Sequence, residues 1–166
     1  MNNGANLESL TDDQLFKMVV RLPISFPIVV TPMRLPEFYY KMKKNLYPDY
    51  LYYALIALGN AASKRARTIE EKEKDNTLIQ KSVNLLKLKT DIRDPYYLWA
   101  CVIILNYFST VVNTSAYETI SLLASMSVKI SKVYQLDLSK VTKLKYSEEE
   151  LEFRRRVFWC FYASER

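Results

Sequence analysis

No charged residue lies between Asp94 and Glu118, and this stretch limits the folds open to the chain more than any other. Asp followed by Pro95 is a strong helix start, because Asp caps a helix and Pro fits its first position. The residues that follow, YYLWACVIILNYFSTVV, are apolar around the whole helix, as in the centre of a helical domain. A membrane-associated protein using Tyr96–Val112 is the alternative, since about 20 apolar residues span a bilayer. We favour a core helix, because the run contains polar residues and the mean hydropathy of the chain is −0.14.

Glycine and proline are scarce, and this composition points to a helical fold. The 166 residues include 2 glycines and 6 prolines, and 49% of them are hydrophobic. An all-β chain needs many turn residues, whereas long helices need few. We therefore expect an all-α, compact multi-helix domain of about five to seven helices, with one core.

Four pairs of a Ser or Thr with a Glu or Gln three residues later predict helix starts, because each side chain can satisfy a free backbone N–H group of the other residue. These pairs are Thr11 with Gln14, Thr68 with Glu71, Ser115 with Glu118, and Ser147 with Glu150. Pro36 and Pro48 mark two more starts.

Apolar spacing predicts which sides of these helices are buried. The helix from about Ile69 to Leu88 should bury Ile79, Val83 and Leu86, and the helix from Ser115 should reach about Leu136. The helix after Pro48 should bury a stripe of Leu51, Ala54, Leu55, Leu58 and Ala62.

The first 35 residues differ from the rest. After a short amphipathic helix from Thr11 to about Arg21, prolines at 23, 27, 32 and 36 forbid regular helix. The residues between them are apolar, so we expect them to lie extended against the protein, with an edge strand as the alternative. We therefore divide the chain into an N-terminal segment, residues 1–35, and a helical domain, residues 36–166.

The residue inventory disfavours catalysis. The absence of histidine removes His-based triads, His general bases and imidazole metal ligands. Two glycines cannot build a phosphate-binding loop. Cys101 and Cys160 lie in apolar helical surroundings, so we expect reduced core residues of an intracellular protein. We predict that the chain is not an enzyme and has no catalytic residue, metal ligand or cofactor of its own, and we name no cofactor-binding residue.

A net charge of +6 permits an acidic partner such as DNA, and two basic clusters are candidates for contacting it. Lys64–Arg67 (KRAR) fits a nuclear-localisation or phosphate-contacting patch, but a solvated helix junction fits better. Arg154–Arg156 spread over too wide an arc of the helix to face one ligand. We expect Glu150 to pair with Arg154 and Glu152 with Arg156, at favourable i,i+4 spacing. The sequence contains no helix-turn-helix, zinc finger or basic zipper.

The last twenty residues, SEEELEFRRRVFWCFYASER, combine an acidic first turn, three arginines and an aromatic turn. They resemble the E-x-x-RRR-(hydrophobic)-FW element of the fungal-specific transcription factor regulatory domain, the helical middle homology region of zinc-cluster transcription factors. LYYALIALGNAAS is similar to a second helix of that family. VKISKVYQLDL is similar to a third, although Gln135 replaces a helix-ending glycine. The resemblance covers Pro36–Arg166 and corresponds to the N-terminal part of the family's domain.

The resemblance implies the regulatory domain of a nuclear transcription factor that relays a metabolite or partner signal. Family architecture implies DNA binding by a six-cysteine zinc cluster on the N-terminal side. This chain has two cysteines, so zinc and DNA binding are expected only from a missing zinc-cluster domain. The other implied partners are a second copy in a homodimer, a transcriptional co-regulator and a small-molecule effector, with no membrane.

In the family, the domain continues beyond the element that ends this chain. We therefore expect a domain truncated at its C-terminus, a fragment or a degenerate copy, whose aromatic turn lacks cover and exposes an apolar patch. A helical adaptor unrelated to transcription, which binds a partner helix in an apolar groove, is the alternative from another functional class.

Overall fold

The computed structural model describes residues 32, 34–62, 66–110, 117–129 and 146–164, and all regular secondary structure in these ranges is α-helical. The predicted all-α fold is confirmed. The labelled helices are α2 (Leu35–Lys43), α3 (Asp49–Ala61), α4 (Ile69–Leu88), α5 (Pro95–Thr110) and α7 (Glu148–Ser164), and residues 117–129 form a further helix.

Several predicted features lie outside the described residues. These are the helix near Thr11–Arg21, nearly all of the proline-rich segment, the capping box of Ser115 with Glu118, and the end of that helix near Leu136. The division of the chain at residues 35 and 36 stays a prediction.

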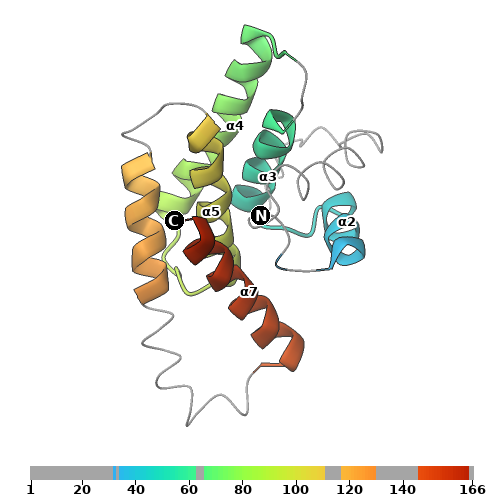
Figure 1. Ribbon diagram of the computed structural model, residues 1–166, viewed down its shortest axis with the longest axis vertical. Helices are drawn as coiled ribbons and strands as arrows, with labels where there is room; N and C mark the ends of the chain where they lie inside the picture. Colours follow the sequence, from blue (N-terminus) through green and yellow to red (C-terminus); the bar gives the residue numbers. More distant parts are fainter. Residues whose placement is uncertain (1–31, 33, 63–65, 111–116, 130–145, 165–166) are drawn as a thin grey trace, which may run out of the picture.

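The core helix predicted from the uncharged run is α5, which lies in the middle of the molecule (Figure 1). Tyr97 and every side chain from Trp99 to Ile104 are 0% exposed. α3 and α7 pack directly against α5, and α3 also packs against α4. α2 and the helix of residues 117–129 lie at opposite edges of the molecule (Figure 1). In the described part of the chain, no helix has the length and apolar character needed to cross a membrane.

α3 buries the predicted stripe and more. Leu51, Ala54, Leu55, Leu58 and Ala62 are all buried. Tyr50, Tyr52, Tyr53, Ala57 and Gly59 are buried as well, because α4 and α5 cover two different sides of this helix. The helical stripe thus identified only part of the buried surface of α3.

α4 begins and ends where the sequence predicts. The Thr68 hydroxyl accepts a hydrogen bond from the Glu71 backbone N–H at 3.2 Å, and the Glu71 carboxylate accepts one from the Thr68 N–H at 3.0 Å. This complete capping box satisfies two N–H groups that a helix start leaves free. Ile79, Val83 and Leu86 are buried, as expected from their spacing.

The N-terminal half of α4 is tied to α3 by a buried carboxylate. Asp75 is 1% exposed, accepts a hydrogen bond from the Asn60 amide at 2.9 Å, and forms an ion pair with Arg67. Burial raises the pKa of Asp75, while hydrogen bonds from Asn60 and Arg67 act in the opposite direction without cancelling the rise. A buried carboxylate needs such partners, because an unpaired one would cost several kcal/mol, on the order of 3–5.

α2 ends in a tight left-handed turn at Asn45, whose φ is 50°. The Asn45 N–H donates to the Met42 carbonyl at 3.1 Å, and the Leu46 N–H donates to the Lys41 carbonyl at 2.9 Å. This is the Schellman pattern, and Asn tolerates its left-handed position better than most residues with a side chain. The turn directs the chain from α2 towards α3.

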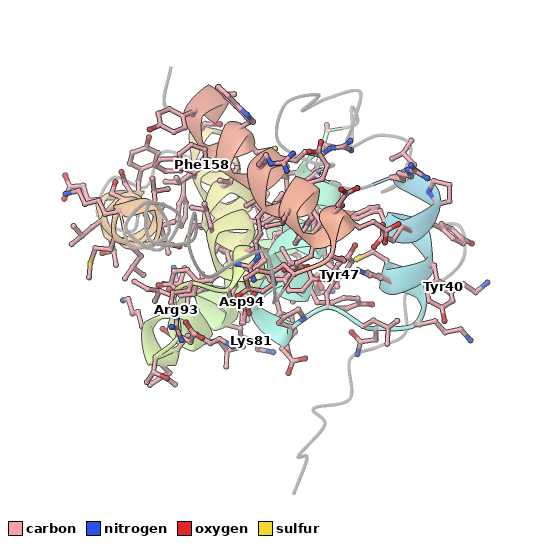
Figure 2. The ribbon with its side chains drawn as sticks, turned by 90° about the horizontal axis from the view of Figure 1, so that it is seen from below. Tyr40, Tyr47, Lys81, Arg93, Asp94 and Phe158 are labelled. Carbon is pink, nitrogen blue, oxygen red and sulfur yellow. The ribbon has the colours of Figure 1, made fainter. Side chains whose placement is uncertain are left out.

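The connection between α4 and α5 is hydrogen-bonded to three other parts of the fold. Asp94 caps α5 by accepting a hydrogen bond from the Tyr96 N–H at 2.9 Å, and its second oxygen accepts one from the Tyr50 hydroxyl of α3 at 3.0 Å. Ser127, in the helix of residues 117–129, donates to the Ile92 carbonyl at 2.6 Å. Arg154 of α7 donates to the Arg93 carbonyl at 3.3 Å. Figure 2 shows Arg93 and Asp94 side by side at this junction.

We predict that Asp94→Ala lowers the free energy of unfolding by about 2 kcal/mol, from the lost cap and the lost partner of Tyr50. The matched control is Asp91→Ala in the same connection, where the carboxylate pairs with exposed Arg93. This change should alter stability by about 0.5 kcal/mol or less. Urea unfolding of both variants measures the difference, and equal losses would contradict the role assigned to Asp94.

We also predict a change in the titration of Asp91. Hydrogen bonds from the Arg93 side chain, then from its backbone N–H, hold the pKa of Asp91 at about 2. A lowered carboxyl pKa favours the folded state above the usual value of 3.8, and this contribution is lost as the pH falls towards 2. Arg93→Met should therefore raise the Asp91 pKa towards 3.8, measured by NMR titration of its carboxyl carbon. An unchanged pKa would show that the guanidinium does not hold this carboxylate.

Candidate functional site

The described residues contain no group of three or more His, Cys, Asp or Glu side chains that could hold a metal ion. Cys101 and Cys160 are buried and are not joined in a disulfide, as predicted. Burial raises the pKa of Cys101 above its usual range and that of Cys160 to about 11. Both thiols are therefore protonated near neutral pH, and a protonated buried thiol is a poor nucleophile. The candidate functional features are α7 and the aromatic side chains that it covers.

α7 begins with an incomplete capping box. The Glu150 N–H donates to the Ser147 hydroxyl at 3.2 Å, which satisfies one free donor of the first turn. The Glu150 carboxylate binds Arg154 at 2.9 Å. The capping box predicted that the Glu150 carboxylate would accept a bond from the Ser147 N–H. The carboxylate binds the Arg154 guanidinium instead, because a bond to a charged donor is stronger than one to a neutral backbone N–H.

The three arginines of α7 are paired within the protein; the pairs of Arg154 and Arg156 were predicted, and that of Arg155 was not. Arg154 binds Glu150, and its guanidinium also lies 4.4 Å from the centre of the Tyr146 ring. Arg155 and Arg156 share the Glu152 carboxylate, each at 2.8 Å. The hydrogen bond from Arg156, with the nearby positive charges, lowers the pKa of Glu152. Arg154 also donates to the Arg93 carbonyl, which joins α7 to the connection before α5.

The apolar half of α7 faces in two directions. Val157, Cys160 and Phe161 are buried on the side that packs against α5. Trp159 is 69% exposed on the other side. The half-buried Phe158, marked in Figure 2, has its ring 4.7 Å from that of Tyr162. The expectation that this aromatic turn lacks cover is therefore wrong for Val157, Cys160 and Phe161, and the exposed apolar surface of the turn is limited to Trp159.

The other basic cluster is partly described. Arg67 is committed to Asp75 and also donates to the Glu71 carbonyl at 3.1 Å. Lys64 and Arg65 lie outside the described residues. Arg67 therefore serves the fold, which agrees with the helix-junction interpretation of this cluster.

Five aromatic side chains meet around Trp99, and we call them the Trp99 cluster: Phe38, Tyr47, Tyr96, Trp99 and Phe153. The Trp99 ring lies 5.6 Å from Tyr47, 6.0 Å from Phe153 and 6.2 Å from Phe38, measured between ring centres. Such tilted and edge-to-face contacts are favourable for aromatic pairs. The cluster joins α2, α5, α7 and the turn before α3, where Figure 2 shows Tyr47 between α2 and the start of α7.

The Trp99 cluster has a polar rim and one unmet hydrogen-bond donor. Lys41 of α2 donates to the Tyr96 hydroxyl at 3.2 Å and pairs with Glu37 at 2.8 Å. Burial lowers the pKa of Lys41, but its bonds to Glu37 and Tyr96 outweigh this effect and the pKa is raised. The Trp99 indole N–H is buried and has no hydrogen-bond partner among the described residues.

The sequence did not identify the Trp99 cluster. Its aromatic residues were expected in the core, and they are, but nothing local indicates that Phe38, Tyr96 and Phe153 meet. The one available signal was the i,i+3 spacing of Tyr96 and Trp99, which places two large rings on the same side of α5.

Comparison with known protein families gives one match. The model of the fungal specific transcription factor domain matches residues 18–166. The match includes α7 with its three arginines, and it begins before Pro36, where the resemblance seen in the sequence began. Searches of curated proteins and of solved structures returned no significant match. Because the family model covers most of the sequence, the chain belongs to the fungal specific transcription factor domain family, whose members are regulatory domains of transcription factors.

Proposed function

We propose that this chain is the signal-receiving regulatory domain of a nuclear, fungal-type zinc-cluster transcription factor. Its role is to sense a metabolite or a protein partner and to set the activity of the DNA-binding part. The observation that carries the proposal is the family match over residues 18–166, since it takes in the packed helices and the arginine-aromatic element together.

The environment of the arginines supports the proposal that this domain regulates and that another part of the factor binds DNA. Contact with duplex DNA needs basic side chains that reach phosphates, and specific reading needs an element shaped for a groove. On α7, Glu150 and Glu152 pair with all three arginines, and Arg154 also binds the backbone of the junction before α5. DNA binding, and the zinc that goes with it, are therefore assigned to a six-cysteine cluster in another part of the factor.

Two surfaces suit the partners of a regulatory domain. The exposed Trp159 offers an apolar contact for a transcriptional co-regulator or for a second copy of the domain in a homodimer. The Trp99 cluster offers buried aromatic side chains and an unmet hydrogen-bond donor for a small-molecule effector. No catalytic step is assigned to the domain, which fits a family of regulatory domains.

We predict that the 166-residue chain changes transcription when it is fused to an unrelated sequence-specific DNA-binding domain in a fungal host. A reporter gene downstream of the corresponding site should differ in output from a strain that carries the DNA-binding domain alone. If the domain regulates through its folded state, Phe161→Ala should abolish the difference, because truncating a buried Phe costs about 3–5 kcal/mol.

Leu122→Ala is the control, since it truncates an exposed apolar side chain in the helix of residues 117–129, which has no assigned partner surface. It should change stability by about 0.5 kcal/mol or less and should retain regulation of the reporter. The proposal would be wrong if the wild-type fusion left reporter output unchanged, or if the unfolded Phe161→Ala fusion regulated as well as the wild type.

A further inference from the structure

The buried indole of Trp99 has a donor that nothing in the described structure satisfies. Its side chain is 0% exposed, and among the described residues its N–H is one of two buried side-chain polar groups without a hydrogen-bond partner, the other being the Tyr97 hydroxyl. An unmet buried donor costs about 1–3 kcal/mol, and such groups are rare enough in native proteins to require a reason. A binding site whose ligand supplies the acceptor is one such reason.

The surroundings of this donor define the chemistry of a matching ligand. The rings of Phe38, Tyr47, Tyr96 and Phe153 surround Trp99 and favour a flat aromatic molecule. Lys41, a cation on the rim of the cluster, already binds Glu37 and the Tyr96 hydroxyl. An uncharged ligand therefore fits better than an anion, which would have to compete with Glu37 for this ammonium group.

α2 covers the cluster and makes little close backbone contact with the other labelled helices. It is nine residues long and inserts Phe38 and Met42, both buried, among the aromatic side chains. Among the described helices, the pairs with extensive close backbone contact are α3 with α4, α3 with α5, and α5 with α7, and α2 is in none of them. Figure 1 shows α2 at the edge of the molecule, beside the bundle. Moving α2 would thus uncover Trp99 while the central helices stay packed.

We propose that the Trp99 cluster is a binding site for a flat, uncharged aromatic molecule that carries a carbonyl oxygen. The rings of the ligand pack among those of the cluster, its carbonyl accepts the hydrogen bond of the Trp99 indole, and α2 shifts to admit it. This inference rests on the proposed regulatory function, for which it locates the effector site. Displacement of α2 would be the conformational change that reports occupancy.

The experiment uses the full 166-residue chain with labelled indole nitrogens, observed by NMR. The chain has two tryptophans, so the exposed Trp159 provides an internal reference for the buried Trp99. The probes are acetophenone and coumarin, each titrated beside a similar molecule that lacks the carbonyl, ethylbenzene and naphthalene respectively. We expect both carbonyl probes to move the Trp99 N–H signal downfield and leave the Trp159 signal in place. We also expect them to bind more tightly than their counterparts by a factor of about three to ten, the value of one hydrogen bond.

Two matched variants isolate the hydrogen bond. Trp99→Phe keeps an aromatic ring and removes the N–H, so the preference for carbonyl probes should disappear. Trp159→Phe makes the same chemical change on the exposed side of α7 and should keep the preference. If Trp99→Phe does not fold, the paired titrations of the wild type decide the question.

The proposal is overturned if neither carbonyl probe moves the Trp99 signal at saturation, or if the paired probes bind equally well. A shift confined to Trp159 would also overturn it, because the probe would then bind only the exposed apolar surface. Each of these results would leave the regulatory role untouched, since reporter output does not depend on these probes.

Discussion

The burial of α5 from Tyr97 to Phe108, broken only at the half-buried Asn106, is the constraint on which the rest of the structure depends. A helix that is apolar on every side is stable in water only when neighbours cover all of its sides, and burial of apolar surface contributes about 25 cal/mol per Å². α3 and α7 supply much of that cover. The start of α5 is fixed by Asp94, which caps the helix and accepts a hydrogen bond from Tyr50 of α3. The adjoining carbonyls of Ile92 and Arg93 bind Ser127 and Arg154. One short connection therefore positions several of the elements around the core.

This arrangement gives the arginine-aromatic element of α7 a role in holding the fold together. Its aromatic half completes the cover of α5 through Val157 and Phe161. In its charged half, Arg154 binds both Glu150 and the connection before α5, so it ties the start of α7 to the start of the core helix. An element that serves core and junction at once can be distinctive for a family without contacting DNA or a ligand. The surfaces proposed for partners are the exposed Trp159 on the same helix and the Trp99 cluster, to which α7 contributes Phe153.

Sequence reasoning succeeded where the signal is local. The capping box of Thr68 with Glu71, the Asp94–Pro95 start and the buried positions of α4 depend on residues a few positions apart, and all are confirmed. It failed where partners are distant or are backbone atoms. The Trp99 cluster joins Phe38 with Phe153, and Ser127 and Arg154 bind carbonyl groups, which leave no mark in a sequence. Glu150 had two partners within reach, and the choice of Arg154 over the Ser147 backbone depends on charge that the capping pattern does not weigh.

The most direct test of this account is the affinity of the chain for duplex DNA, measured by fluorescence anisotropy at physiological salt. The wild type is compared with a variant in which Arg154, Arg155 and Arg156 are all replaced by Gln, on two duplexes of unrelated sequence. If the arginines serve the fold, the wild type should bind both duplexes equally and weakly, in the non-specific range of about 10⁻⁴–10⁻⁶ M. The variant should lose stability without losing any preference between duplexes. Tight binding of one duplex by the wild type, abolished in the variant, would contradict the claim that α7 is an architectural element of a regulatory domain.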